Sequence, residues 1–576
     1  MPANSEKDPK VAPVQPDSYT STVPADEPPS LSRIMDSASP APGSVQDSRI
    51  HAFSVSPAST FLEEVADQIA YRPVRASLCR ELREHITDRA EDYVSQGMTP
   101  KDAEAAAVRS MGDPLALGAQ LNKIHSLQKS PALAVLSLLL LLTGFGFAAW
   151  MQWSPEQSAN GFLYYLPGTL LLLLTAWKGC PLVIRHHRIL LTLAACLYIV
   201  QGLLAFLVRH GRYVFFGTHV TGYFSLLLFG PILILLAYRL RRHGPWTLAA
   251  AMILCTAAIA VFHRYVTGTF GLSASLVLAF SLAAALLAMI RRGILGLENA
   301  SQNRPNGTYR NRKGILYGIL LAGTLLTGAW FLSSPDKLLA ADAFVHPEAS
   351  VHSTWDDTYN NVLIRELLSR TPAVGGLNLD PEELMDYGTG AWYFSDRDPL
   401  QIGLDVAHLK TEADQQAFDE AYARRREAGA FPRLIHYDQS DVTLWDILPQ
   451  HYHNNYLIAV TMFLYGRIPG LLLAAVLAGF YLVLFSCIHK IHGKLAFSLA
   501  CCCGFCLLGQ SILYVLGNLG YQYACFTNLP LVSEGKISIL FNMMLLGFIF
   551  SAYRYDHVLE EPASRHFLVS RQTPAS

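Results

Sequence analysis

Long apolar runs fill this chain from Pro131 to Tyr553, and their lengths constrain its fold more than any other feature. A helix rises about 1.5 Å per residue, so about 20 apolar residues cross a hydrocarbon layer about 30 Å thick. Inside a bilayer the backbone must satisfy its own hydrogen bonds, which favours helices. Ten runs come near this length: 131–151, 161–178, 188–208, 221–239, 246–262, 268–290, 314–333, 455–487, 495–518 and 536–553. The sequence therefore predicts an all-α integral membrane protein with about ten transmembrane helices.

The composition agrees with this class. Of the 576 residues, 51% are hydrophobic and 15% are charged, and the formal net charge is -1. This balance is typical of a membrane protein and gives no reason to expect a nucleic-acid partner. Four cysteines crowd one run, Cys501, Cys502, Cys503 and Cys506, but no second set of ligands accompanies them. We interpret them as small apolar packing residues and predict no metal site.

The segments before the first span differ sharply in composition. Residues 1–58 are rich in Pro, Ser, Ala and Asp, and cannot bury enough apolar surface to offset their ordering entropy. They are predicted to form a disordered tail. Residues 59–128 have apolar residues every four positions, and Thr99-Pro100 and Asp113-Pro114 are typical helix starts. We predict a small helical module there, with a docking role and no catalytic residue.

The positive charges predict the orientation of the membrane domain, 129–556. Lys and Arg gather in alternate loops, which are cytoplasmic in most membrane proteins. These loops contain Lys178, Arg185, Arg188, Arg239, Arg241, Arg242, Arg291, Arg292, Arg310, Arg312, Lys313, Lys490, Lys494 and Arg554. Both termini, including the tail 557–576, are therefore expected in the cytoplasm. The large polar loop 334–452, between spans seven and eight, is expected outside.

The outer loop carries helix signals of its own. Asp380-Pro381 is a typical helix start, and Thr411 with Asp414 forms a capping-box pattern that opens a helix over 411–428. This second helix has an apolar stripe, made of Leu409, Ala413, Ala417, Phe418 and Ala421. We expect the loop to pack as a small extracytoplasmic subdomain over the membrane core.

The loop re-enters the membrane through a dense polar segment, Leu448-Pro449-Gln450-His451-Tyr452-His453-Asn454-Asn455-Tyr456. This segment resembles the loop-end motif Leu-Pro-Glu-x-His-Thr-Asp-Phe of the FtsW/RodA/SpoVE family, with one extra residue. Further on, Gln510 and the segment Leu529-Pro530-Leu531-Val532-Ser533-Glu534-Gly535 are similar to the family's Gln and its Leu-Pro-x-x-Ser-Tyr-Gly motif. Gly268-Thr269 stands where the family has Pro-Asp-Leu-Gly-Thr. The likeness covers about residues 131–556 and agrees with the predicted topology.

This resemblance implies peptidoglycan glycosyl transfer during cell division, elongation or sporulation. The donor would be a polyprenyl-pyrophosphate-linked disaccharide, and a penicillin-binding transpeptidase would be a partner. The residues implied in substrate binding are Gln510, Pro530, Ser533, Gly535, Gly268 and Thr269. A divalent cation could accompany the pyrophosphate, although no cofactor is certain.

The chain departs from the family at its acidic positions. The catalytic Asp of the loop-end motif corresponds to Asn455, or to Asn454 given the extra residue. The paired Glu residues correspond to Phe463-Leu464, and the Asp before Gly-Thr corresponds to Val266. A neutral amide cannot take a proton from an attacking hydroxyl. His451 or His453, within the same segment, could replace the missing base. Asp446, Asp441 or Asp438, just before the segment, could also do so. Catalysis and catalytic impairment both remain open from the sequence.

Two other classes of function fit the same features. A transporter, or flippase, for a lipid-linked substrate would also have ten spans with polar positions, although it should carry paired charges within them. A membrane scaffold or sensor would use the 59–128 module for a cytoplasmic regulator. That module resembles the helical prefix found before some permease-like membrane proteins, through Arg75, Glu81-Leu82, His85-Ile86, Gly97-Met98 and Met111-Gly112-Asp113-Pro114.

Overall fold

The computed structural model describes residues 56–559, except 153–162, 208–218, 242, 263–270, 296–305, 334, 450–451, 525–527 and 534. Of the two predicted tails, residues 1–55 and 560–576 lie outside this part of the chain. Among the described residues, eight helices are long and apolar enough to cross a membrane, and strand structure is limited to two short segments. The protein is an all-α integral membrane protein.

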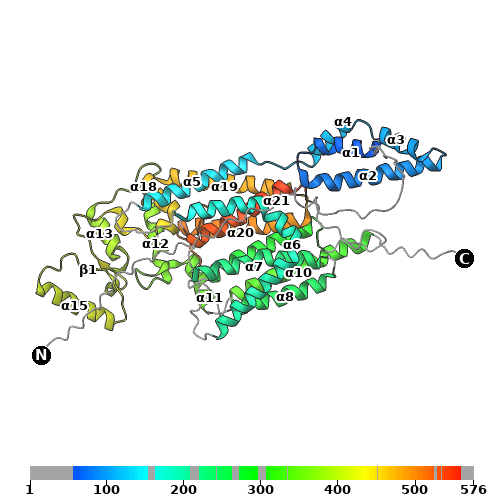
Figure 1. The fold of residues 1–576 in the computed structure, drawn as a ribbon. Coiled ribbons are helices and arrows are strands. Elements are labelled where there is room, and N and C mark those ends of the chain that lie inside the picture. Colours follow the sequence, from blue (N-terminus) through cyan, green and yellow to red (C-terminus); the bar gives the residue numbers. More distant parts are fainter. Residues whose placement is uncertain are drawn as a thin grey trace, which may run out of the picture.

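The membrane domain consists of long apolar helices that run side by side (Figure 1). Their bounds are α5 Pro131–Gln152, α6 Tyr165–Leu207, α7 His219–Leu240, α8 Pro245–Phe262, α9 Gly271–Arg291, α10 Asn306–Phe331, α19 Arg467–His489, α20 Lys494–Asn518 and α21 Lys536–Tyr555. All except α8 reach the length and hydropathy of a span within their described residues. Each of the ten predicted runs corresponds, over its described residues and to within a few residues at its ends, to one of these helices or to the short helices just before α19.

Two of the predicted spans are continuous in the structure. Helix α6 covers most of 161–178 and of 188–208, and its 43 residues would extend about 65 Å, twice the thickness of a bilayer core. It is two helices joined at a kink, because His186 has non-helical backbone angles (φ -118°, ψ 18°). Pro181 lies one turn earlier and lacks the N–H that would continue the backbone ladder.

The eighth predicted span is divided instead. Gly466 separates α18 (Leu457–Tyr465) from α19, with φ +100°. A Cβ at this position would lie 2.7 Å from the carbonyl oxygen of Ala373 in the outer loop. Only glycine can therefore make this break.

Helix α20 lies at the centre of the bundle and packs against α7, α9, α19 and α21. Two-thirds of the residues in the most apolar stretch of α20 are buried. In the corresponding stretches of α6 and α10, only 6% of the residues are buried. The exposed side chains of these outer helices are leucines such as Leu166 and Leu321. Such side chains are suited to contact lipid rather than water.

The N-terminal module contains four helices, α1 Pro57–Gln68, α2 Arg72–Ser95, α3 Pro100–Ser110 and α4 Pro114–Ile124. Thr99 and Asp113 cap α3 and α4, which confirms the helix starts expected from Thr-Pro and Asp-Pro. The apolar core of the module includes Phe61 and Val65 from α1, Ile69 directly after it, and also Tyr555 at the end of α21 and Val558 just beyond it. The module therefore packs against the C-terminal end of the membrane domain.

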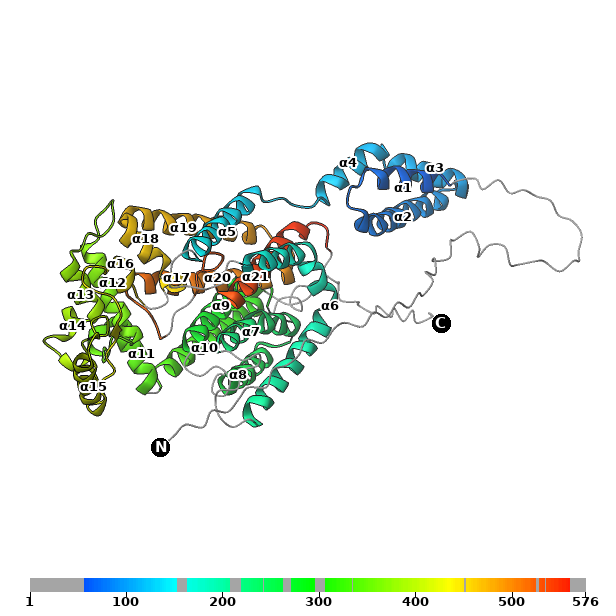
Figure 2. The ribbon, with the colours of Figure 1, turned by 60° about the vertical axis from the view of Figure 1, so that its left-hand side comes forward.

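The outer loop forms a helical domain at the opposite end of the bundle (Figures 1 and 2). Its helices are α11 Pro335–Val345, α12 Asp357–Arg370, α13 Pro381–Thr389, α14 Ala391–Phe394, α15 Glu412–Glu427, α16 Leu444–Ile447 and α17 Tyr452–Asn455. Two short parallel strands, β1 Leu404–Asp405 and β2 Leu434–Ile435, pair in the register Leu404 to Leu434.

The two helices expected in this loop are present. Asp380 with Glu383 and Thr411 with Asp414 both form complete capping boxes. The expected packing of α15 is wrong, however, because this helix buries none of its residues. Its apolar stripe consists mainly of alanines, whose small side chains gain little from burial.

Candidate functional site at the outer end of the bundle

The loop-end segment enters the membrane domain through α17 and α18, directly beneath the outer domain. Asn455, at the position of the family's acid, is only 3% exposed. Neither polar atom of its side chain has a hydrogen-bond partner among the described residues. Buried amides are normally paired, since an unpaired one costs about 1–3 kcal/mol, so this side chain is a candidate for contact with a ligand.

Helix α20 holds the backbone of this segment in place. Asn518 accepts hydrogen bonds from the backbone N–H groups of Ile458 (2.9 Å) and Ala459 (3.0 Å) with its Oδ1. Its Nδ2 donates to the carbonyl oxygen of Asn455 at 2.9 Å. The Tyr514 hydroxyl accepts from the N–H of Leu457 at 3.0 Å. These bonds satisfy N–H groups that the first turn of α18 leaves free.

Helix α12 of the outer domain also holds the loop-end segment through hydrogen bonds. The Tyr456 hydroxyl donates to Oε1 of Gln522, and Asn360 of α12 also hydrogen-bonds to Tyr456. Asn361 of α12 accepts from the backbone N–H of Gln522 at 3.2 Å. We call Asn360, Asn361, Asn455, Asn518 and Gln522 the carboxamide cluster; all five are buried.

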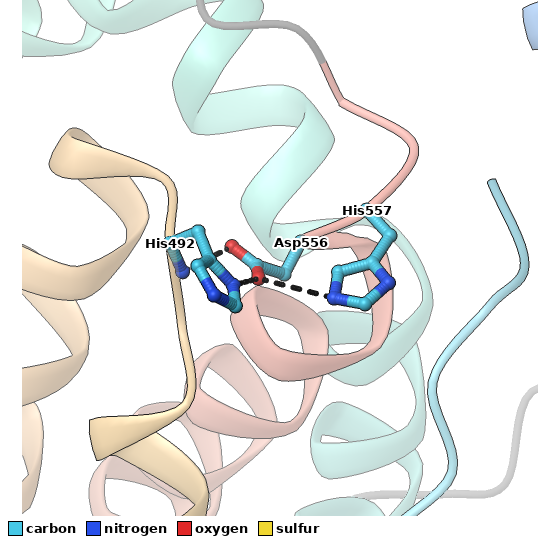
Figure 3. Close-up of side chains that lie close together, drawn as sticks. All are labelled: His492, Asp556 and His557. Atoms are coloured by element: carbon cyan, nitrogen blue, oxygen red, sulfur yellow. Dashed lines mark hydrogen bonds and ion pairs between the residues drawn. The ribbon is translucent and has the colours of Figure 1, made fainter. Parts of the chain in front are cut away.

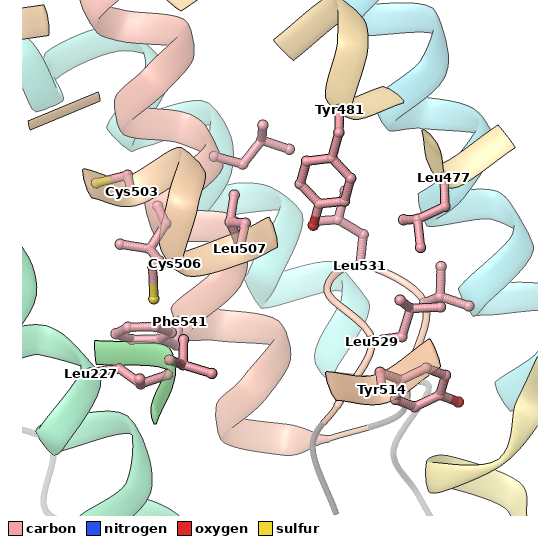
Figure 4. Packing of buried hydrophobic residues seen from close by; sticks show 14 of the residues in the cluster. Leu227, Leu477, Tyr481, Cys503, Cys506, Leu507, Tyr514, Leu529, Leu531 and Phe541 are labelled. Atoms are coloured by element: carbon pink, nitrogen blue, oxygen red, sulfur yellow. The ribbon is translucent and has the colours of Figure 1, made fainter. Parts of the chain in front are cut away.

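The second motif joins this cluster across a long stretch of sequence. Ser533 donates from its hydroxyl to the carbonyl oxygen of Asn454 at 2.9 Å and accepts from the N–H of Leu529 at 2.8 Å. Pro530 is buried in the same turn, and Gly535 caps α21, where a Cβ would lie 2.6 Å from Nδ2 of Asn528. Figure 4 shows Leu529 and Leu531 beside Tyr514 in the apolar layer under this turn.

Gln510 lies deeper, at the contact between α20 and α21. It is fully buried and donates through Nε2 to Oδ1 of Asn542 at 3.0 Å and to the carbonyl oxygen of Cys506 at 3.3 Å. It thus makes the interhelical hydrogen bond that polar residues within spans commonly provide. The neighbouring cysteines of α20 are buried in the same packed layer.

The acids near the motif have other partners. The Asp446 carboxylate accepts from the N–H (2.8 Å) and the hydroxyl (2.7 Å) of Thr443, and so caps its own short helix. Asp438 faces His408 at 3.3 Å. His451, Gly268, Thr269 and the side chain of His453 lie outside the part of the chain that the structure describes.

Of the charged residues of α12, the sequence favoured a position on the solvated surface for Asp357 and did not single out Arg365. Asp357 interacts electrostatically with Tyr456, although its side chain is exposed. Arg365 donates through Nε to the carbonyl oxygen of Gly520 at 2.9 Å and pairs with Glu348 at 3.1 Å. Its Nη2 is buried without a partner among the described residues. The spacing of Asp357, Asn360 and Asn361 places all three on one face of a helix, and this pattern in the sequence could have indicated the polar face of α12.

Among the described residues, the site therefore offers neutral amides, hydroxyls, one exposed carboxylate and one guanidinium, at the end of the bundle that carries the domain formed by residues 335–452. Carboxamides both donate and accept hydrogen bonds, as sugar hydroxyls and peptide groups require. A guanidinium is well suited to phosphate oxygens.

No protein-family model matches this chain, and no curated protein matches it. A solved structure described as "Structural coordination of polymerization and crosslinking by a peptidoglycan synthase complex" is similar at 15% identity and a TM-score of 0.42. The similar region covers 74% of this chain and 97% of that chain. At this identity and TM-score the likeness is a distant one.

Proposed function

We propose that this protein binds a polyprenyl-pyrophosphate-linked disaccharide in bacterial peptidoglycan synthesis and is impaired in polymerising it. The ordered motifs of the sequence support the substrate class. One structural observation supports the impairment: Asn455 stands buried at the acid position, and its described neighbours in the cluster are amides and hydroxyls.

The chemistry of glycosyl transfer explains why this matters. A general base must take the proton of the attacking hydroxyl, and positive charge must stabilise the departing pyrophosphate. Asn455 can neither take a proton nor supply positive charge. The carboxylate of Asp446 already caps its own short helix. Arg365, or a divalent cation held by the substrate, would balance the pyrophosphate charge. The described residues of the site thus have groups for recognition and include no buried base.

The proposal places the protein in the bacterial cytoplasmic membrane with both termini inside. The carboxamide cluster then lies at the outer surface, where lipid-linked precursor is consumed. A penicillin-binding transpeptidase would contact the outer domain, and a cytoplasmic regulator would contact the module of α1–α4.

The test uses full-length protein in lipid nanodiscs with fluorescent polyprenyl-pyrophosphate disaccharide. We expect saturable binding and no polymer, with or without a cognate transpeptidase. Asn455→Leu should weaken binding about three- to tenfold, the effect of losing one or two hydrogen bonds from a neutral amide. Gln401→Leu is the matched control, because Gln401 is also a buried carboxamide of the outer domain but lies outside the cluster.

Polymer formation would contradict the impaired assignment. If polymer forms and Asp357→Asn, Asp446→Asn or His453→Ala abolishes it, the protein is an active glycosyltransferase with a relocated base. Equal binding by the wild type, Asn455→Leu and Gln401→Leu would show that the carboxamide cluster is not part of the binding site.

A transporter is the second candidate, favoured by the break at Gly466. Broken helices near substrate sites are common in secondary transporters. Translocation of the labelled precursor across proteoliposomes, without polymer, would favour this alternative.

A further inference from the structure

Three metal-ligating side chains meet at the cytoplasmic end of the bundle, far from the carboxamide cluster. His492 lies in the turn between α19 and α20, and Asp556 and His557 directly follow α21 (Figure 3). One ligand atom from each residue lies within 4.8 Å of the other two. The sequence gave no indication of this group, because 64 positions separate His492 from Asp556.

The Asp556 carboxylate is fixed in orientation. Its Oδ1 accepts hydrogen bonds from the backbone N–H groups of His492 and Gly493, both at 2.8 Å. Its Oδ2 lies 2.9 Å from Nδ1 of His492 and 3.9 Å from Nε2 of His557. The carboxylate is fully buried, whereas the imidazoles of His492 and His557 are 79% and 38% exposed. One oxygen therefore faces two imidazoles that can turn at the protein surface.

These donors match a particular class of ion. Two imidazole nitrogens and one carboxylate oxygen suit Zn²⁺ and other late first-row divalent ions, whereas Mg²⁺ and Ca²⁺ prefer oxygen ligands alone. Around a tetrahedral Zn²⁺, with bonds of about 2.0–2.1 Å, neighbouring ligand atoms lie about 3.3 Å apart. The two separations at Asp556, 2.9 and 3.9 Å, lie on either side of this value. A rotation of the imidazoles would bring all three atoms into range, and water could fill the fourth position.

We propose that His492, Asp556 and His557 bind a Zn²⁺-class divalent ion that joins the α19–α20 turn to the end of α21. The ligands are neutral imidazoles and an ionised carboxylate, so binding releases any proton held by the histidines. This inference does not rest on the proposed function of the outer site.

The position of the ion gives it a structural consequence. The N-terminal module docks on the same short segment: the N–H of Gln128 donates to the carbonyl oxygen of Arg554 at 3.0 Å. Nδ1 of His125 lies 3.2 Å from the carbonyl oxygen of His557. Tyr555 and Val558 on either side of the ligands belong to the apolar core of the module. An ion held by Asp556 and His557 would therefore rigidify the surface on which the module sits.

The experiment uses purified full-length protein in detergent, stripped with EDTA, and Co²⁺ as a spectroscopic probe. We expect one equivalent of Co²⁺ to give visible absorption of a low-coordinate site, and Zn²⁺ to displace it. His492→Ala and His557→Ala should each weaken binding at least about tenfold. His489→Ala is the matched control, since this histidine ends α19 but lies outside the group.

A second measurement separates a specific site from loose binding to surface histidines. Zn²⁺ should slow hydrogen exchange in residues 57–124 of the wild type and of His489→Ala, and not in His557→Ala. His492→Ala and His557→Ala both keep the Asp556 carboxylate, which holds the backbone N–H groups of residues 492 and 493 just before α20, so the fold should persist. Equal Co²⁺ affinity in all four proteins, or no binding by the wild type, would overturn the proposal.

Discussion

At the scale of single residues, the most informative position is Asn455. Its amide occupies a buried site that a carboxylate would occupy in the family that the chain resembles, and its described neighbours in the carboxamide cluster are neutral. An amide can remain buried there without a counter-charge, whereas a carboxylate could not remain ionised at low cost. The neutral, buried surroundings of position 455 therefore fit an amide better than a carboxylate.

Asn455→Asp should make stability depend on pH. Burial raises the pKa of the new carboxyl in the folded state above its unfolded value of about 3.9. The variant is then as stable as the wild type below this unfolded value and loses stability as the pH rises toward the folded pKa. At neutral pH we expect a loss on the order of 3 kcal/mol. Thermal unfolding in detergent from acidic to neutral pH measures this, with Asn455→Leu as the pH-independent control. If the difference in melting temperature between Asn455→Asp and the wild type does not change with pH, the site tolerates a charged carboxylate.

His408 has two acidic partners, one close to it in sequence and one that only the fold brings near. Asp405, three positions earlier, and Asp438, beyond β2, both contact its imidazole. The hydrogen bond that the His408 imidazolium donates to the Asp405 carboxylate is the main reason that the pKa of His408 is raised, with a smaller effect of the charges of Asp405 and Asp438. Its stabilising effect is thus complete below the unfolded pKa of about 6.5 and disappears as the pH rises through the folded pKa.

We therefore expect His408→Gln to lower the melting temperature of the full-length protein at about pH 6 and to have no effect at about pH 9. The matched comparison is His352→Gln, at an exposed histidine of the same outer domain. An effect of His408→Gln that is the same at both pH values would contradict an ionic role.

At the scale of elements, the break between α18 and α19 positions the site. Helix α18 is only nine residues long, and α20 and α12 hold its start. The break allows α18 to end against the outer domain, where the Gly466 backbone contacts Ala373 and Val374.

Gly466→Ala should destabilise the protein by about 1–3 kcal/mol, because its backbone angles (φ +100°, ψ 169°) are almost restricted to glycine and the new Cβ meets the outer loop. Gly479→Ala, within α19, is the control: no atom lies within 4 Å of its Cβ, so the change should be neutral or slightly stabilising. Thermal unfolding of both variants in detergent measures the difference. Equal melting temperatures would show that the break is not under strain.

At the scale of the whole molecule, two soluble parts sit at opposite ends of one helical bundle (Figures 1 and 2). The outer domain is fastened through α12, and the N-terminal module is fastened through the end of α21. Helices α20 and α21 lie between these two attachments and are the most buried of the candidate spans.

Val558→Asp should release the module from the membrane domain. Val558 is buried in the apolar core of the module, and an unpaired carboxylate there costs several kcal/mol. We expect faster hydrogen exchange in α1 and α2 and faster proteolysis near residues 125–130. Val94→Asp, at an exposed valine of α2, should change neither. Protection equal to wild type in Val558→Asp would show that the module is held by other contacts.

The sequence by itself determined the class, the helices and the ends of many helices. These features depend on local patterns: the length of apolar runs, and caps such as Thr99, Asp113 and Asp380 that act within one turn. It also placed Asn455 and Ser533 in separate motifs. The tertiary structure decided that the runs within α6 are joined across a kink, that α15 stays exposed, and that Ser533 reaches Asn454. It alone brought Asn360 to Tyr456 and Asp556 to His492. These pairs are far apart in the chain, so their meeting depends on helix packing, which no local pattern encodes.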